Sequence, residues 1–152
     1  MKRFALLLMV FLLLPFLSAE IVVLQNPGGL YNMGNTISVP LKITSLTESG
    51  GFFTINLICN GLETEVHKEY IFIQTGDEVE KNPPIPLIKE VIGNSKGLCR
   101  IRYSFGSDAK LTEEFTISNL ININIISQGK EFAPWQEIII EGEAKRENGE
   151  IT

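Results

Sequence analysis

The sequence predicts an all-β fold, an antiparallel β-sandwich that follows an N-terminal signal peptide. Three observations support this prediction. Apolar and polar residues alternate in short runs, turn-forming residues separate these runs at short intervals, and no amphipathic stretch of helical length is present. Of the 152 residues, 44% are hydrophobic and 20% are charged, which is typical of a globular protein. This length accommodates about one domain with additional elements.

The first residues have the pattern of an export signal. Lys2 and Arg3 form a positive start, an apolar run covers residues 4–17, and the small residues 18–19 precede Glu20. Residues 1–19 are therefore predicted to be a signal peptide cleaved after Ala19. The apolar run is shorter than the roughly 20 residues of a membrane-spanning helix, so an uncleaved anchor is the alternative. We expect a secreted or cell-surface protein that meets the membrane only through this segment.

The charge balance argues against a nucleic-acid partner. The whole chain has a net charge of −5, and without the leader's two basic residues 18 acidic residues face 11 basic ones, a net charge of −7. Binding to a duplex requires clustered lysines and arginines that displace counterions. The densest basic groups are Lys145 with Arg146 and Arg100 with Arg102, which are too small for that role.

Two cysteines, Cys59 and Cys99, are the only ones in the chain, and an even pair in an exported domain favours a disulfide. In residues 53–59 and 99–105 the odd positions are apolar and include the cysteines, so both sulfurs should point inward. A bridge over this separation would stabilise the fold by about 4 kcal/mol. Two buried thiols are the alternative. A metal site is not expected, because His67 is the only histidine that could join the cysteines.

Strands are expected throughout the exported part, with hardly any helix. Residues 37–43 alternate and contain Pro40, which suggests an edge strand because proline lacks an amide hydrogen. A Gly50-Gly51 turn is expected before residues 53–59. The predicted strands cover residues 21–24, 37–43, 53–59, 64–74, 85–92, 98–105, 111–118, 121–126 and 137–144.

The chain also contains an internal echo. Residues 30–39 align without gaps with residues 131–140, which lie 101 positions later, and the aromatic and apolar positions coincide. A period near 100 residues is that of one immunoglobulin-like domain. We therefore expect an immunoglobulin-like β-sandwich at residues 20–119 and the first strands of a second, truncated one at residues 120–152. A chance match, or a complete protein with a final hairpin, is the alternative.

These two segments resemble the aromatic-x-Pro-Gly-x-x-hydrophobic entry strand of macroglobulin-like and related immunoglobulin-like domains. The matching positions are Gly29, Tyr31, Gly34, Ile37 and Val39, with Phe132, Pro134, Ile138 and Ile140 in the echo. Such domains occur in tandem in secreted and cell-surface proteins, including those of archaea and bacteria. The resemblance implies a spacer or binding module whose neighbours are further domains of the same chain.

No sequence motif of a catalytic, phosphate-binding or cofactor-binding site is present, so neither an enzyme nor a cofactor is expected. We expect His67 to be a solvated strand residue and the acidic group Asp77, Glu78 and Glu80 to be a solvated turn rather than a calcium loop. The predicted function is a non-catalytic structural or adhesive module with an unknown protein or cell-surface partner. The alternative is an accessory domain of a larger secreted enzyme or macroglobulin-like inhibitor whose active part lies beyond residue 152.

Overall fold

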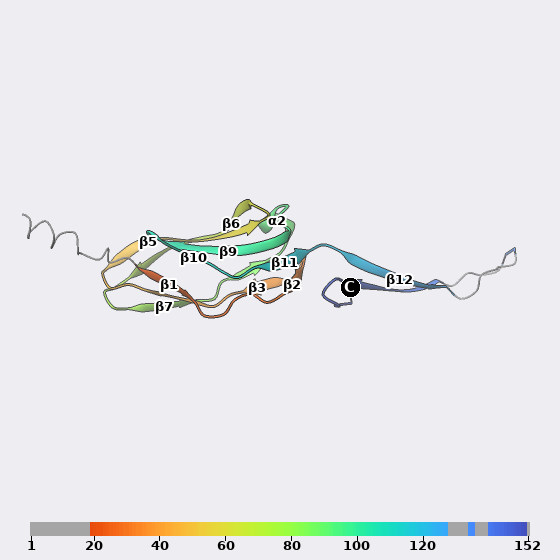
Figure 1. Ribbon diagram of the computed structural model, residues 1–152, viewed down its shortest axis with the longest axis horizontal. Coiled ribbons are helices and arrows are strands. Elements are labelled where there is room, and N and C mark those ends of the chain that lie inside the picture. Colours follow the sequence, from red (N-terminus) through yellow and green to blue (C-terminus); the bar gives the residue numbers. More distant parts are fainter. Residues whose placement is uncertain (1–18, 128–133, 136–139, 152) are drawn as a thin grey trace, which may run out of the picture.

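The computed structural model describes residues 19–127, 134–135 and 140–151, and among these it shows an all-β protein with one short helix. Two layers of strands form a body (residues 19–118), and a two-stranded hairpin extends from one end of it (Figure 1). The expected signal peptide lies outside the described residues except for Ala19, which packs against the core of the body. No described helix is long and apolar enough to cross a membrane.

The first layer of the body is a six-stranded sheet. Its order is β2 (Leu30–Asn32), β11 (Phe115–Ser118), β9 (Gly97–Phe105), β5 (Ser49–Cys59) and β6 (Leu62–Ile73), and β10 (Asp108–Leu111) also pairs with β9. All pairings are antiparallel except that of β2 with β11. The two long strands β5 and β6 form a hairpin through Asn60-Gly61, a turn at which both residues have positive φ.

The second layer consists of two short sheets that continue one another. One contains β1 (Glu20–Val23), β4 (Leu41–Thr44) and β7 (Glu78–Lys81), and the other contains β3 (Thr36–Ser38) and β8 (Pro84–Pro86). Leu41 pairs with Lys81 and Ser38 pairs with Pro84, so both ladders share one register.

The break between these ladders contains Pro40 and Pro83, which cannot donate an amide hydrogen to a ladder. Burial nevertheless alternates through residues 37–43 as predicted, with the odd positions buried. The predicted edge strand is only partly confirmed, because β3, before Pro40, is an edge strand of its two-stranded sheet, whereas β4, after it, is the middle strand of its sheet.

Alternate residues of both layers enclose the core. In β5 and β9 the inward positions are the predicted ones, and each is at most 2% exposed: Phe53, Ile55, Leu57, Cys59, Cys99, Ile101, Tyr103 and Phe105. The second layer contributes mainly isoleucine, leucine and valine. The Phe53 and Tyr103 rings stack with centroids 6.1 Å apart, and burial raises the pKa of the Tyr103 hydroxyl. Period-two burial therefore holds the two layers together.

The predicted strand at residues 85–92 is only partly a strand. β8 ends at Pro86, and a helical turn, α2 (Lys89–Ile92), follows. Lys89 and Glu90 are both exposed whereas Val91 and Ile92 both pack toward the core. Two polar residues followed by two apolar ones fit a period near 3.6 rather than a period of 2.

The predicted Gly50-Gly51 turn is also wrong, because both glycines lie inside β5 and pair with Phe72 and Ile71 of β6. A glycine is required at position 50 because the Tyr70 side chain comes close to it across the β5–β6 hairpin. A Cβ atom at Gly50 would lie 2.6 Å from the Tyr70 hydroxyl oxygen. The chain instead turns at residues 45–48, between β4 and β5.

The predicted strand at residues 111–118 divides into β10 and β11, which follow one another along the same edge of β9. At the break, the Ile101 backbone N–H donates to the Thr112 hydroxyl oxygen at 3.0 Å, and the Thr112 N–H donates to the Ile101 carbonyl at 2.9 Å. The side chain thus supplies the acceptor that a regular ladder would take from the backbone.

Candidate interaction surfaces

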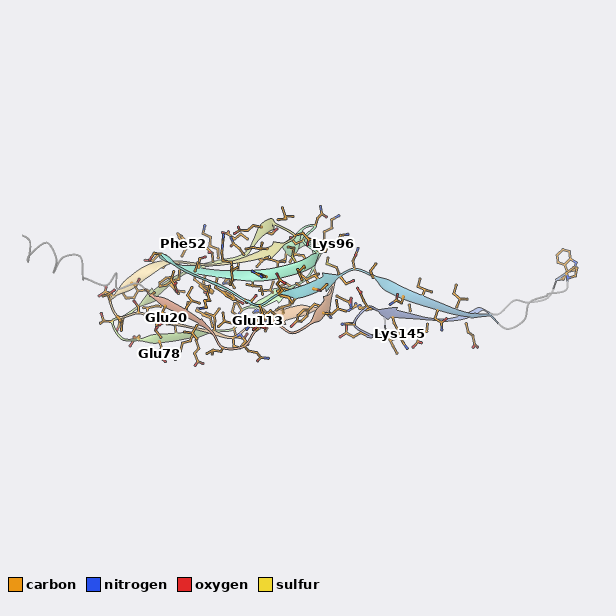
Figure 2. The ribbon with its side chains drawn as sticks, in the orientation of Figure 1. Glu20, Phe52, Glu78, Lys96, Glu113 and Lys145 are labelled. Carbon is orange, nitrogen blue, oxygen red and sulfur yellow. A yellow bond between two sulfur atoms is a disulfide. The ribbon has the colours of Figure 1, made fainter. Side chains whose placement is uncertain are left out.

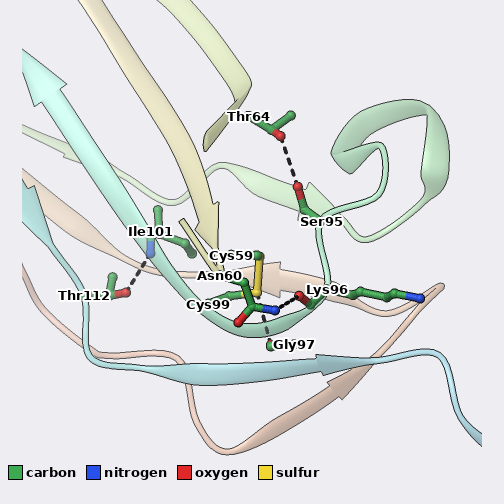
Figure 3. Close-up of a disulfide and its surroundings, with 9 residues drawn as sticks. All are labelled: Cys59, Asn60, Thr64, Ser95, Lys96, Gly97, Cys99, Ile101 and Thr112. Carbon is green, nitrogen blue, oxygen red and sulfur yellow. Dashed lines mark hydrogen bonds between the residues drawn. A yellow bond between two sulfur atoms is a disulfide. The ribbon is translucent and has the colours of Figure 1, made fainter. Parts of the chain in front are cut away.

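A disulfide joins Cys59 at the end of β5 to Cys99 near the start of β9, the pair that the sequence predicts (Figure 3). The two residues are direct cross-strand partners with Cα atoms 4.1 Å apart, and both are buried. The bridge therefore lies within one sheet and does not connect the two layers. A disulfide of this kind is typical of an oxidising compartment outside the cytoplasm.

The loop that follows α2 is fixed beside the disulfide. Ser95 is buried, and its hydroxyl lies 3.0 Å from the Thr64 hydroxyl of β6. The Asn60 side-chain amide donates to the Lys96 carbonyl at 3.2 Å, as Figure 3 shows. Gly97 then enters β9 with φ of +89°. Contacts from β6 and from the turn between β5 and β6 therefore hold the backbone at Ser95 and Lys96.

The hairpin that extends from the body consists of β12 (Ile121–Ser127) and β13 (Ile140–Arg146). Only Asn119 and Leu120 separate β12 from β11, so the connection is short. Figure 2 places Lys145 on this hairpin and Lys96 near the end of the body from which it leaves.

Polar contacts link the hairpin to the body. The Asn35 side-chain amide donates to a Glu150 carboxylate oxygen at 3.2 Å, and the Asn148 side-chain amide donates to the Asn35 side-chain oxygen Oδ1 at 3.4 Å. Arg146 forms an ion pair with Glu150 at 3.4 Å and lies beside Gly34. Hydrogen bonds from Asn148 and Asn35, together with Arg146, hold the pKa of Glu150 below its ordinary value. These contacts set the direction of the hairpin relative to the body.

One face of β12 is apolar and exposed. Ile121, Ile123 and Ile125 are 55%, 69% and 64% exposed, and they alternate with Asn122 and Asn124. Alternation of this kind in the body marks strands with one face in the core. A row of isoleucines in water is unfavourable by about 25 cal/mol for each Å² of apolar surface.

The hairpin repeats features of the body at the predicted offset. β12 begins 101 residues after β1, and it pairs antiparallel with β13 as β1 pairs with β4, with the register displaced by one residue. Gly34 has φ of +93°, and Trp135, its counterpart in the echo, has φ of +70° and lies in a turn. Residues 131–133 and 136–139 of the echo lie outside the described residues.

The outer face of the β5–β6 hairpin carries aromatic side chains that the sequence analysis did not single out. Phe52, Tyr70 and Phe72 are 58%, 63% and 53% exposed. The Phe52 and Tyr70 rings meet edge to face at 5.7 Å, and the Lys68 ammonium lies 5.0 Å from the Phe52 ring centroid. Adjacent residues of a strand point to opposite faces of the sheet, so Phe52 must face outward because Phe53 faces the core. The exposed position of Phe52 could therefore have been predicted from the sequence.

His67 is not the solvated strand residue that the sequence predicts. It pairs with Ile55 and is half-buried, with its ring 6.3 Å from that of Phe53 and its Nε2 atom 3.5 Å from a Glu69 carboxylate oxygen. The same carboxylate oxygen is 3.0 Å from Lys81 Nζ of β7. Burial alone would raise the pKa of Glu69, but the hydrogen bonds and charges of Lys81 and His67 outweigh it and lower the pKa.

The side chains of His67, Glu69 and Lys81 link β6 to β7, which is a structural role. Within the part of the chain that the structure describes, no group of three or more histidine, cysteine or acidic residues could hold a metal ion. The acidic residues Asp77, Glu78 and Glu80 are all exposed, as predicted, but Glu78 and Glu80 belong to β7 rather than to a turn. Glu78 forms an ion pair with Lys42 at 3.2 Å.

Comparisons with known proteins identify a fold but no family. No protein-family model matches the chain, and no curated protein matches it. Among solved structures, the chain is similar to a β-glucosidase from Listeria innocua in complex with glucose, with a TM-score of 0.54 and 13% identity over 68% of this chain. A β-glucosidase from Erythrobacter marinus is similar with a TM-score of 0.51 and 8% identity over 66% of this chain. The matched part is 16% and 15% of those two chains, so the likeness concerns one β-structured part of a larger protein.

Proposed function

We propose that this protein is a non-catalytic extracellular module with a structural or adhesive role. In this proposal residues 20–119 form an immunoglobulin-like β-sandwich, and residues 120–152 form the first strands of a second one. The signal peptide at residues 1–19 directs export, and the Cys59–Cys99 disulfide fits the oxidising compartment that export reaches.

The observation that carries the proposal is the repetition of the β1–β4 pairing by β12 and β13. In the body, the inward face of this pair is covered by the six-stranded sheet, which leaves Ile21, Leu41 and Ile43 at most 2% exposed. In the hairpin, the isoleucine face of β12 has no such cover. A second sheet supplied by a following domain would bury it.

The short connection and the polar contacts at Asn35 and Glu150 suit a spacer. Two sandwiches joined by two residues and held by side-chain hydrogen bonds form a stiffer rod than two joined by a long linker. A stiff rod can hold a distal binding domain away from the cell surface.

The secreted product tests this proposal directly. We expect N-terminal sequencing of the exported protein to begin at Glu20, and the intact mass to exceed that of residues 20–152 because the second sandwich is complete. An exported product that ends at Thr152 would contradict the tandem arrangement. A product that keeps residues 1–19 would indicate that this segment is an uncleaved membrane anchor rather than a cleaved signal peptide.

A second candidate function is an accessory domain of a larger secreted enzyme or macroglobulin-like inhibitor. The similar β-glucosidase structures favour it, because there the matched part belongs to a much larger enzyme. The same mass measurement, combined with hydrolysis assays on aryl glycosides, separates the candidates. Hydrolysis by the full exported product, but not by residues 20–152, would favour the accessory role.

A further inference from the structure

A cavity of about 280 Å³ opens at the end of the body from which the hairpin leaves. It is bounded by the loop after α2, by the turn after β2 and by the connection to the hairpin. The lining residues are Met33, Lys89, Gly93, Asn94, Ser95, Lys96 and Asn119. Sites for small molecules often lie where two structural units meet, and this volume is close to the lower end of their usual range, about 300 Å³.

The charge of the cavity is opposite to that of the protein. The exported part has more acidic than basic residues, yet the charged side chains in the lining are both lysines. Each described arginine, and Lys42, Lys81 and Lys145, forms an ion pair. Lys89 and Lys96 have none among the described residues. Two lysines without an ion-pair partner that line one cavity favour a bound anion.

The walls are suited to a small organic anion rather than to a bare ion. Asn94 and Asn119 line the cavity, and an asparagine amide can donate to hydroxyl or carboxylate oxygens. Met33 supplies a half-buried apolar wall. The cavity is also several times larger than the share of one water molecule, about 30 Å³.

The backbone at Lys96 is fixed before any ligand arrives. The buried Ser95 hydroxyl contacts Thr64, the Lys96 carbonyl accepts from Asn60, and the disulfide lies three residues further along the chain at Cys99 (Figure 3). A fixed backbone reduces the entropy that binding must otherwise remove. We propose that this cavity binds a small carboxylate-bearing ligand of about the size of an acidic monosaccharide, with Lys89 and Lys96 contacting the carboxylate.

An NMR titration of the oxidised protein, residues 20–152, tests this inference. The probes are glucuronate, glucose as the neutral sugar, and inorganic sulfate as the bare anion. We expect glucuronate to shift the backbone resonances of residues 93–96 and 119, with glucose binding more weakly by about tenfold or more because the charge-assisted hydrogen bonds are lost. Sulfate should bind more weakly than glucuronate.

The variant pair Lys89→Gln with Lys96→Gln should weaken glucuronate binding by about tenfold or more. The pair Lys68→Gln with Lys110→Gln makes the same change in charge at lysines that also lack ion pairs but do not line the cavity, and it should leave binding unchanged. Spectra of both variants away from the cavity report that the fold is intact.

Each of these results would overturn the inference: no shifts at residues 93–96 with glucuronate, equal loss of binding in both variant pairs, or binding of glucose as tight as that of glucuronate. Sulfate that binds as tightly as glucuronate would limit the site to bare anions and would also overturn the assignment. The tandem arrangement is tested by the mass of the exported product, so the two proposals can fail separately.

Discussion

Cys59 and Cys99 face each other directly across two neighbouring strands of one sheet, with Cα atoms 4.1 Å apart. The disulfide therefore closes a loop of chain that contains β6, β7, β8 and α2 without crossing the core. Most of its stabilisation should come from restricting the unfolded chain rather than from joining the layers.

Replacement of both cysteines by alanine should lower the free energy of unfolding by about 2–4 kcal/mol, measured by urea denaturation under two-state analysis. The single variant Cys99→Ala, which leaves a free thiol, should lose a similar amount. An unchanged denaturation midpoint in the double variant would show that the bridge does not form in the exported protein.

Thr112 supplies the acceptor for the Ile101 N–H inside the body, so Thr112→Val should leave that donor unsatisfied. We expect a loss of about 1–3 kcal/mol in the free energy of unfolding, because the two side chains have nearly the same shape and only the hydroxyl is removed. That hydroxyl also donates to the Glu113 carbonyl at 2.9 Å. The control Thr112→Ser keeps the hydroxyl and should lose less. Equal losses in both variants would assign the effect to packing rather than to the hydrogen bond.

Gly97 has φ of +89°, and a Cβ atom there would lie 2.5 Å from the Asn60 amide nitrogen. Gly97→Ala should therefore destabilise the body by about 1–3 kcal/mol, through backbone strain and displacement of Asn60. Gly28→Ala is the matched control, since nothing lies within 4 Å of a Cβ atom at that position. Thermal unfolding of both variants checks this prediction, which fails if the two midpoints shift equally.

The Glu69 carboxylate should make stability depend on acid pH. Its pKa is lower in the folded protein than its ordinary value, so its stabilisation is present above the unfolded pKa and is lost as the pH falls through the folded pKa. The side chain is partly exposed, so the contribution at neutral pH should be at most about 1 kcal/mol. Glu69→Gln should lower stability at pH 7 but not at pH 2, and a difference that persists at pH 2 would exclude the charge as its cause.

The alternation of apolar residues was sufficient to predict the all-β fold and the inward faces of β5 and β9, and the cysteine count together with the export signal predicted the disulfide. The alternation failed where local spacing changes. Residues 89–92 form a helical turn, and Gly50 lies within a strand at a position that requires a glycine because the Tyr70 hydroxyl is close to it. The lysine cavity could not be predicted for the same reason. On a continuous strand Lys89 and Lys96, an odd number of positions apart, would face opposite sides, whereas the helical turn and the tethered loop bring both to one cavity.

The aromatic face and the ion pair of Glu69 with Lys81 depend on which strands become neighbours. Strand neighbours follow from the topology and not from the periodicity of one segment. The echo of residues 30–39 is a different case. The sequence contains both copies, but only the structure shows that β12 pairs with β13 much as β1 pairs with β4.

Hydrogen–deuterium exchange at β12 is the most direct test of the claim that the hairpin begins a second sandwich. The natural exported protein and residues 20–152 are compared with and without Ile123→Asp. We expect the β12 amides to exchange slowly in the exported protein and rapidly in residues 20–152, and Ile123→Asp to speed exchange only in the exported protein. Rapid exchange of β12 in both proteins, unaffected by the substitution, would contradict the claim.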